Sequence, residues 1–350
     1  MKRRILKQRL MLGFILLCGA TLFTWAVSRL TPEPPGVFGD RIFDSQATIP
    51  TASVPMPDTI PTVLGFDDIT FTNPPKIPMP PPNTNIVFSA EYVQSLTNFN
   101  YLTHRIFLVD PETILFPSDI NVIEFLEADL TIDTSMDGPQ VLIFHTHSTE
   151  MFADSNPAYP MTGIMGVGAY LAKVLEENHG IRAYHHTERF DIVEGRSRIQ
   201  GAYERMEPVI RQILADNPSI QIVIDLHRDG VGNHVPAFVR YVNDNPTAQI
   251  MFFNGLSRQN RNGQAVTIYR LPNPYQRENL NFSFRLQLAA NQLYPGLARR
   301  VYLRAFRYSL HMAPLSTLVE VGNQHNTQQQ AKNAMYPLAH IIAAVVLGSS

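Results

Sequence analysis

The stretch Val141-Leu142-Ile143-Phe144-His145-Thr146-His147-Ser148-Thr149-Glu150 places a short apolar segment directly before two imidazoles and a carboxylate. Its first four residues predict a buried strand, because they are all apolar and are followed by polar residues. In open α/β sheets, ligands bind beyond the carboxyl ends of the strands. His147 and Glu150 are three residues apart, a spacing at which a ring nitrogen and a carboxylate oxygen can reach one cation from a tight turn. A metal site is expected at this strand end if other parts of the chain supply further ligands.

Downstream of this stretch, strand-like and helix-like segments alternate, which favours an α/β layer architecture. The expected strands span residues 140–144, 181–185, 220–226, 237–242, 250–253 and 317–321. The expected helices span residues 163–178, 199–215, 274–293 and 328–346. The roughly 210 residues involved are enough for one hydrophobic core.

Two further strand ends supply chemically active side chains. The strand at residues 220–226 runs into His227, and the strand at 317–321 contains Glu320. A carboxylate in an apolar strand is costly to bury unless it is paired or functional. Two imidazoles and one carboxylate around zinc leave a fourth position open for water, so His147, Glu150 and His227 suit a hydrolytic metal site.

Glu320 is expected to act as the general acid and base of this site. It would take the proton of the attacking water and pass it to the leaving nitrogen, and its apolar neighbours should raise its pKa. Asp225 lies on the same side of its strand as His227 and could orient that ring through an N–H bond. His145 shares the face of His147 if the strand continues, so it remains an alternative ligand or a hydrogen-bonding neighbour.

Each of these residues also has a structural interpretation. His147 and His227 could be hydrogen-bonded histidines without a metal, Glu150 a solvated carboxylate or helix cap, and Glu320 the ion-pair partner of Arg304. Ser148 beside a histidine suggests a nucleophile, but no Gly-x-Ser-x-Gly turn surrounds it.

The N-terminus predicts a membrane anchor at residues 1–29. Lysines and arginines precede an apolar run from Leu10 to Val27, which is long enough to span a bilayer as a helix. The basic flank should stay in the cytoplasm, which makes the protein a single-pass membrane protein with an extracytoplasmic catalytic domain. A cleaved signal peptide is the alternative.

Composition divides the rest of the chain. Residues 30–85 are rich in proline and predict a linker, with a docking segment as the alternative. Residues 86–137 are expected to be a lead-in segment that packs on a catalytic domain at residues 138–350. The single cysteine, Cys18, lies in the apolar run, so disulfides and thiol chemistry are excluded elsewhere. Beyond residue 30, 22 basic and 30 acidic side chains argue against nucleic acid as a partner.

Several motifs in the same order resemble the stage II sporulation protein P family, from about Asn98 to the C-terminus. They are His145–Glu150, Asp225–Asp229, Tyr294–Leu297, Arg307–Ser309 and Leu318–Asn323. The resemblance implies a fold similar to zinc-dependent N-acetylmuramoyl-L-alanine amidases, with a twisted, mostly parallel mixed sheet flanked by helices. It implies cleavage of peptidoglycan between muramic acid and the stem peptide, and also of peptide cross-links, during engulfment of the forespore. The implied partners are the stage II sporulation proteins D, a lytic transglycosylase, and M, a membrane protein.

By position, His147 and His227 match zinc ligands in this resemblance, Glu150 the carboxylate ligand and Glu320 the catalytic acid and base. The amidases place their ligand glutamate further downstream, near the start of the next helix. Residues 162–168 contain no carboxylate here, so Glu150 takes that role. Ser309 and Leu310 depart from the asparagine and glutamine that usually follow in the family. A zinc carboxypeptidase and an inactive wall-binding scaffold of the same fold are the alternative functions.

Overall fold

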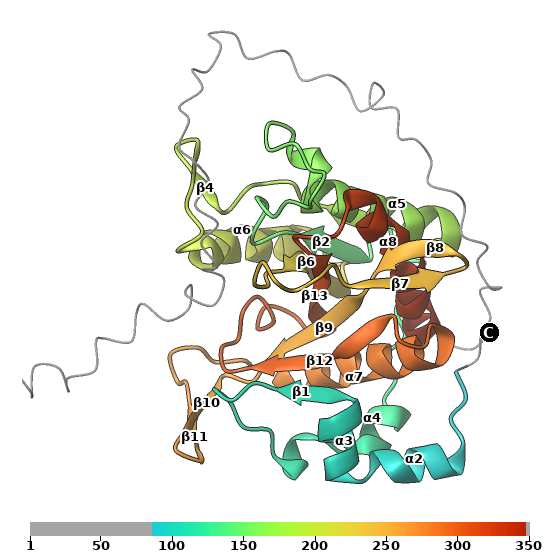
Figure 1. The fold of residues 1–350 in the computed structure, drawn as a ribbon. Coiled ribbons are helices and arrows are strands. Elements are labelled where there is room, and N and C mark those ends of the chain that lie inside the picture. Colours follow the sequence, from blue (N-terminus) through green and yellow to red (C-terminus); the bar gives the residue numbers. More distant parts are fainter. Residues whose placement is uncertain (1–85, 348–350) are drawn as a thin grey trace, which may run out of the picture. The chain divides into compact units, whose positions relative to one another are not determined.

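A computed structural model of the protein describes residues 86–347 (Figure 1). The expected membrane anchor at residues 1–29 and the proline-rich linker at 30–85 lie outside this range. Within it, no helix combines the length and the apolar character needed to cross a membrane.

The centre of the described structure is a seven-stranded mixed sheet with the order β1-β12-β9-β13-β6-β2-β3. Its strands are β1 (Phe107–Val109), β2 (Val141–Phe144), β3 (Ala183–His185), β6 (Ile222–Asp229), β9 (Ile250–Gly255), β12 (Ala298–Arg304) and β13 (Ser316–Asn323). Neighbouring strands are parallel except β9 and β13, which pair antiparallel. The sheet therefore consists of two parallel halves that run in opposite directions.

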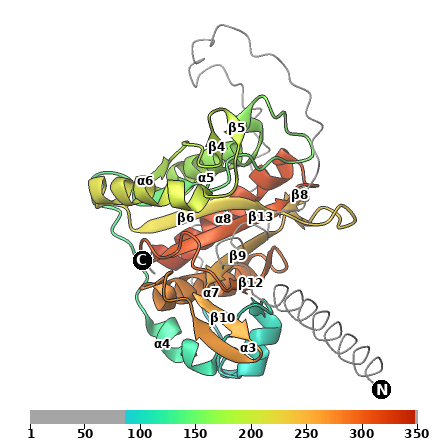
Figure 2. The same cartoon turned by 90° about the vertical axis from the view of Figure 1, so that its left-hand side faces the viewer.

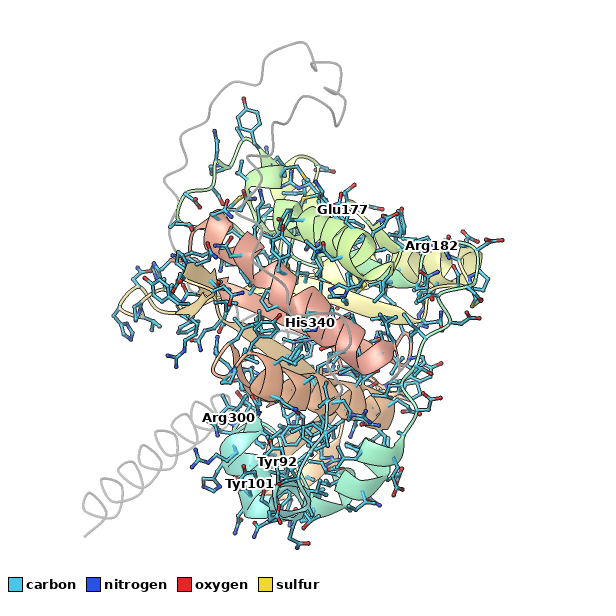
Figure 3. The ribbon with its side chains drawn as sticks, turned by 90° about the vertical axis from the view of Figure 1, so that its right-hand side faces the viewer. Tyr92, Tyr101, Glu177, Arg182, Arg300 and His340 are labelled. Carbon is cyan, nitrogen blue, oxygen red and sulfur yellow. The ribbon has the colours of Figure 1, made fainter. Side chains whose placement is uncertain are left out.

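Helices cover both faces of this sheet. They are α2 (Ala90–Leu96), α3 (Phe99–Arg105), α4 (Val122–Glu127), α5 (Ile164–His179), α6 (Ala202–Asp216), α7 (Gln276–Leu293) and α8 (Gln328–Val346), with short 3-10 turns η3 (Pro117–Asp119) and η4 (Pro160–Thr162). Figure 3 shows α8 lying between α5 and α7 on one face, with Glu177 on α5 and His340 on α8. Helix α6 lies on the opposite face (Figure 2).

The alternation of side chains along each strand decides which helices it contacts. In β2, Val141 and Ile143 join the core formed with α5, α7 and α8, whereas Leu142 and Phe144 pack with α6. Both sets are fully buried, because the strand is covered on its two faces. The apolar run that predicted a buried strand is explained by this double covering.

The segment before residue 138 contributes directly to the sheet. Helices α2 and α3 start with side-chain caps from Ser89 and Asn98. Strand β1 then pairs with β12 as the edge strand, with Phe107 opposite Val301. This segment was expected to pack on the catalytic body, and its strand β1 extends that body's sheet.

Most of the expected elements are present, with ends shifted by a few residues, and the expected helix at 328–346 is reproduced at its bounds. The pattern missed β12, a central strand that is rich in arginine and only partly buried. It also missed two hairpins, β4 (Ile192–Val193) with β5 (Arg196–Ser197) and β10 (Arg258–Arg261) with β11 (Gln264–Thr267). A third hairpin was predicted in part: its strand β7 (Val239–Val242) was expected, but its partner β8 (Asn245–Ala248) was not. The missed strands are either polar or, in β4, only two residues long, so they lack the apolar signal of a buried strand.

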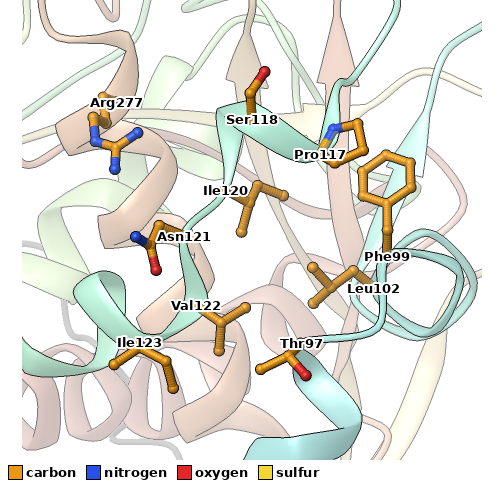
Figure 4. Close-up of a pocket in the computed structure, with 10 residues that line it drawn as sticks. All are labelled: Thr97, Phe99, Leu102, Pro117, Ser118, Ile120, Asn121, Val122, Ile123 and Arg277. Atoms are coloured by element: carbon orange, nitrogen blue, oxygen red, sulfur yellow. The ribbon is translucent and has the colours of Figure 1, made fainter.

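A cavity of about 440 Å³ lies among the N-terminal helices (Figure 4). Its lining is mostly apolar and includes Phe99, Leu102, Ile120 and Val122, with Arg277 at one side. None of the residues expected to form the metal site lines it.

Candidate active site

The candidate site lies at the carboxyl ends of β2, β6 and β13, on the face of the sheet that α6 covers. These three strands are parallel, so their ends meet at one edge. The register places Phe144 opposite Asp225, and His227 opposite Glu320. The predicted residues from three distant parts of the chain are therefore brought together.

His227 is fully buried between two carboxylates. Its Nε2 lies 2.7 Å from Asp225 Oδ1, and its Nδ1 lies 3.4 Å from Glu150 Oε1. Burial alone would lower the pKa of His227, but the charges of Asp225 and Glu150 outweigh burial and raise this pKa well above its usual value. Burial likewise opposes ionisation of both carboxyls, yet the charge of His227 keeps the pKa of Asp225 and of Glu150 below the ordinary value.

Asp225 also fixes the chain that follows β2. Its carboxylate accepts hydrogen bonds from the backbone N–H of Thr146 at 2.9 Å and from the Thr146 hydroxyl at 2.7 Å. One buried carboxylate thus holds both the His227 ring and the start of the turn that contains His147. Such a carboxylate behind a histidine is the usual way in which proteins orient a metal-binding ring.

A second buried carboxylate, Asp191, holds the middle of that turn. It accepts hydrogen bonds from Ser148 Oγ at 2.6 Å and from the backbone N–H of Thr149 at 2.8 Å. Ser148 is therefore occupied by Asp191 and by Arg189, whose Nε donates to its hydroxyl. No local pattern marks Asp191 as a site residue, because it lies about 40 residues downstream in an irregular segment.

Glu150 closes the turn and contacts two elements. Its Oε2 accepts a hydrogen bond from the backbone N–H of Arg228 at 2.8 Å. Its carbonyl oxygen accepts one from Ile164, the first residue of α5. Glu150 thus lies against the start of the helix that follows β2, although it precedes that helix by many residues.

His145 and His147 point to opposite faces of the sheet, because β2 ends at Phe144. The His147 ring lies edge-on to the His227 ring, with centroids 5.3 Å apart. His145 faces α5 instead: its Nδ1 lies 2.7 Å from the carbonyl oxygen of Leu226, and its Nε2 lies 2.8 Å from His185 Nε2. A side chain at Gly168 would collide with this pair, so the glycine of α5 makes room for it.

Glu320 is buried in β13, with 2% of its surface exposed. Its Oε2 is buried and has no hydrogen-bond partner among the described residues. Arg304, the arginine considered as its partner, pairs with Asp110 at 3.0 Å instead. Burial, reinforced by the nearby charge of Asp229, raises the pKa of Glu320 well above its ordinary value. This carboxyl therefore has the environment of a proton-transferring group.

Tyr203, on α6, is a further residue at the site that sequence reasoning missed. Its ring is edge-on to His147, with centroids 5.6 Å apart, and its hydroxyl is buried. Burial and the surrounding carboxylates raise the pKa of Tyr203 well above its ordinary value. A tyrosine in an amphipathic helix looks like a packing residue in sequence, so no local pattern marks it.

The side chains of His147, Glu150 and His227 are of the types that bind zinc, since two imidazoles and a carboxylate are its usual ligands in hydrolytic sites. Ligands around tetrahedral zinc are separated by about 3.3 Å, given bond lengths near 2.0–2.1 Å. The 3.4 Å between His227 Nδ1 and Glu150 Oε1 matches this spacing. Within residues 86–347, no group of three or more histidine, cysteine, aspartate or glutamate side chains is arranged as a complete metal site.

Comparison with protein families gives one match over most of the chain. The family model described as Stage II sporulation protein P (SpoIIP) matches residues 98–343. The stage II sporulation protein P of Bacillus subtilis (strain 168) is 22% identical over 228 residues. This alignment covers 60% of the present chain and 52% of the Bacillus protein, so the chain spans about half the length of that relative.

Solved structures of amidases resemble the chain at low identity. N-acetylmuramoyl-L-alanine amidase AmiC2 of Nostoc punctiforme is 16% identical, with a TM-score of 0.34, and the match covers 61% of this chain and 97% of that one. An N-acetylmuramoyl-L-alanine amidase from Clostridium difficile 630 is 12% identical, with a TM-score of 0.36, covering 59% and 94% of the two chains.

Proposed function

This chain belongs to the stage II sporulation protein P family, and we propose that it is a zinc-dependent hydrolase of peptidoglycan. Its substrate bond is the amide between N-acetylmuramic acid and the L-alanine of the stem peptide, as in an N-acetylmuramoyl-L-alanine amidase. The observation that carries the proposal is the gathering of His147, Glu150 and His227 beside Glu320, whose buried Oε2 has no hydrogen-bond partner among the described residues.

His147, Glu150 and His227 would hold the zinc ion. The chemistry that zinc supplies when bound is polarisation of the carbonyl and acidification of water. Asp225 keeps the His227 ring oriented through Nε2, which leaves Nδ1 as the nitrogen that faces Glu150. Asp191 and Asp225 hold the turn from Thr146 to Thr149 rigid, so that the donors are preorganised.

Glu320 moves the proton. It accepts a proton from water as the water oxygen bonds to the amide carbonyl carbon, and it donates that proton to the nitrogen as the C–N bond breaks. A carboxyl with an ordinary pKa would hold almost no proton at neutral pH. The raised pKa of Glu320 allows one side chain to serve as base and then as acid.

The cellular setting belongs to the same proposal. Residues 1–29 would anchor the protein in the cell membrane, residues 30–85 would serve as a linker, and residues 86–350 would act on the wall outside the membrane. Cleavage of peptide cross-links, a role in forespore engulfment, and partnership with the stage II sporulation proteins D and M are further parts of it. Family membership supports a role in sporulation. The apolar run and the proline-rich composition of the N-terminal residues support the anchor and the linker.

The test is digestion of purified peptidoglycan by the full-length chain in detergent, with the bound metal measured by elemental analysis. Chromatography of the products identifies the bond: free stem peptides that begin with L-alanine indicate an amidase. Newly exposed termini within cross-links indicate an endopeptidase, and released terminal D-alanine indicates a carboxypeptidase. Glu320→Gln should lower the cleavage rate by about 10²- to 10⁴-fold. Glu177→Gln on the surface of α5 is the matched control and should cleave like the wild type (Figure 3). Absence of zinc, or undiminished cleavage by Glu320→Gln, would reject the mechanism.

A further inference from the structure

We propose that the hydroxyl of Tyr203 donates a hydrogen bond to the carbonyl oxygen of the scissile amide as that oxygen becomes negatively charged. Tyr203 is then a catalytic residue of the hydrolysis proposed above, and the inference rests on that function. The observation behind it is a buried phenol hydroxyl at the site with no hydrogen-bond partner among the described residues.

An unsatisfied buried hydroxyl is unusual. Nearly all buried polar groups in proteins find a partner, since leaving one unpaired costs free energy. The buried Tyr170 follows the rule, since its hydroxyl donates to that of Tyr336 at 2.7 Å. The exception at Tyr203 therefore points to a partner that arrives with the substrate.

The position of Tyr203 suits this role. Its ring contacts His147 edge-on, with centroids 5.6 Å apart. Together with burial, the negative charges of Asp225, Glu320 and Glu150 act on its hydroxyl and help to raise its pKa. Glu320 Oε2 is also buried without a partner in the described part of the chain. One hydrogen-bond donor and one proton acceptor are thus left unsatisfied in the same site.

Hydrolysis of an amide needs one group of each kind. When the water oxygen bonds to the carbonyl carbon, Glu320 takes a proton from water and the π electrons of the carbonyl move to its oxygen. Tyr203 would stabilise that oxygen through its O–H, keeping its own proton throughout. The C–N bond then breaks, the carbonyl re-forms, and the nitrogen receives the proton from Glu320.

The ring of Tyr203 is also held in place before substrate binds. It packs edge-on against Tyr308, with centroids 5.7 Å apart, and Tyr308 packs against Phe253 at 4.7 Å. A donor that is fixed in advance needs no reorganisation during the reaction, which is the condition for strong oxyanion stabilisation.

The experiment compares Tyr203→Phe with the wild type, using the full-length zinc-loaded protein and purified peptidoglycan. Removal of the single oxygen should lower kcat by about 10²- to 10³-fold, the usual effect of losing one oxyanion donor. KM and zinc affinity should stay unchanged, and the melting temperature should stay the same or rise slightly, because the hydroxyl has no hydrogen-bond partner to lose among the described residues. Tyr170→Phe is the control and should behave in the opposite way, with a lower melting temperature and an unchanged kcat.

A phosphonamidate analogue of muramoyl-L-alanine gives a second readout without turnover. Its anionic oxygen mimics the charged intermediate, so its affinity should fall in Tyr203→Phe by about the same factor as kcat. Wild-type kcat and analogue affinity in Tyr203→Phe would overturn the inference while leaving the proposed hydrolase intact. A lower kcat accompanied by a lower melting temperature would also overturn the inference, because it would show that Tyr203 is a packing residue. Failure of the wild type to cleave peptidoglycan would overturn the inference together with the proposed function.

Discussion

Replacing Glu320 by glutamine should change activity and stability in opposite directions. The carboxyl is 2% exposed, its Oε2 lacks a partner among the described residues, and burial raises its pKa well above 4.5. Loss of a general acid and base lowers the rate by about 10²- to 10⁴-fold. Removal of a buried ionisable group that the fold cannot satisfy should make the metal-free protein more stable.

The size of the stability gain depends on pH. Because the pKa of Glu320 is higher in the folded state, the protonated carboxyl favours folding below the unfolded pKa of 4.5, and this contribution is lost as pH rises through the folded pKa. The loss amounts to at most about 1.4 kcal/mol per pH unit. Between pH 5 and pH 7 the free energy of unfolding of the wild type should therefore fall by about 1–3 kcal/mol relative to that of Glu320→Gln. This range also matches the cost of an unsatisfied buried polar group.

Urea unfolding of the chelator-treated proteins at pH 5, 6, 7 and 8 measures this difference. The two proteins should have similar stability at pH 5 and should diverge as the pH rises, with Glu320→Gln the more stable. The exposed Glu177→Gln variant should follow the wild type within about 0.5 kcal/mol at every pH. Parallel pH profiles of wild type and Glu320→Gln would show that the carboxyl is not held neutral by burial, and would refute the reasoning.

Three further outcomes are expected. Asp191→Asn should lower the free energy of unfolding by about 1–3 kcal/mol, because a charge-assisted bond to Thr149 N–H is lost. Zinc titration should also show weaker binding. An unchanged unfolding free energy together with an unchanged zinc affinity would contradict the role of Asp191. Asp225→Asn should lower zinc affinity by about 10- to 100-fold, since the His227 ring loses its orienting carboxylate, and calorimetric titration measures this. Burial lowers the pKa of His185 to about 3, so stability should be full above about pH 6.5 and fall as the pH drops toward 3. His185→Gln should flatten that acid limb in urea unfolding, and an unchanged slope would count against a buried neutral ring.

Much of the site was predictable because each residue has a local signal. His147, Glu150 and His227 follow apolar strands, and Glu320 interrupts one, which is a costly placement without a function. Parallel strands bring their carboxyl ends together, so the sequence predicts these residues at one edge of the sheet. The structure places them there, with His227 opposite Glu320.

Other parts of the site had no local signal. Asp191 comes from an irregular segment between β3 and β4, and Tyr203 from the first turn of α6. Tyr203 reaches the site because α6 packs on that face of the sheet. Asp191 reaches it through hydrogen bonds from Ser148 and Thr149. Strand β12 was likewise missed, because its arginines interrupt the apolar pattern from which a strand within the sheet is predicted.

The sequence by itself determined the α/β architecture, the strands that end in functional residues, and the residue types available for hydrolysis. These depend on the periodicity and chemistry of neighbouring residues along the chain. Only the tertiary structure decided that β9 enters the sheet antiparallel to β13, and that His147 faces His227 while His145 turns to α5. The physical reason is that one residue more or less in a strand moves every following side chain to the other face, and the strand's end is fixed by distant pairing partners rather than by local sequence.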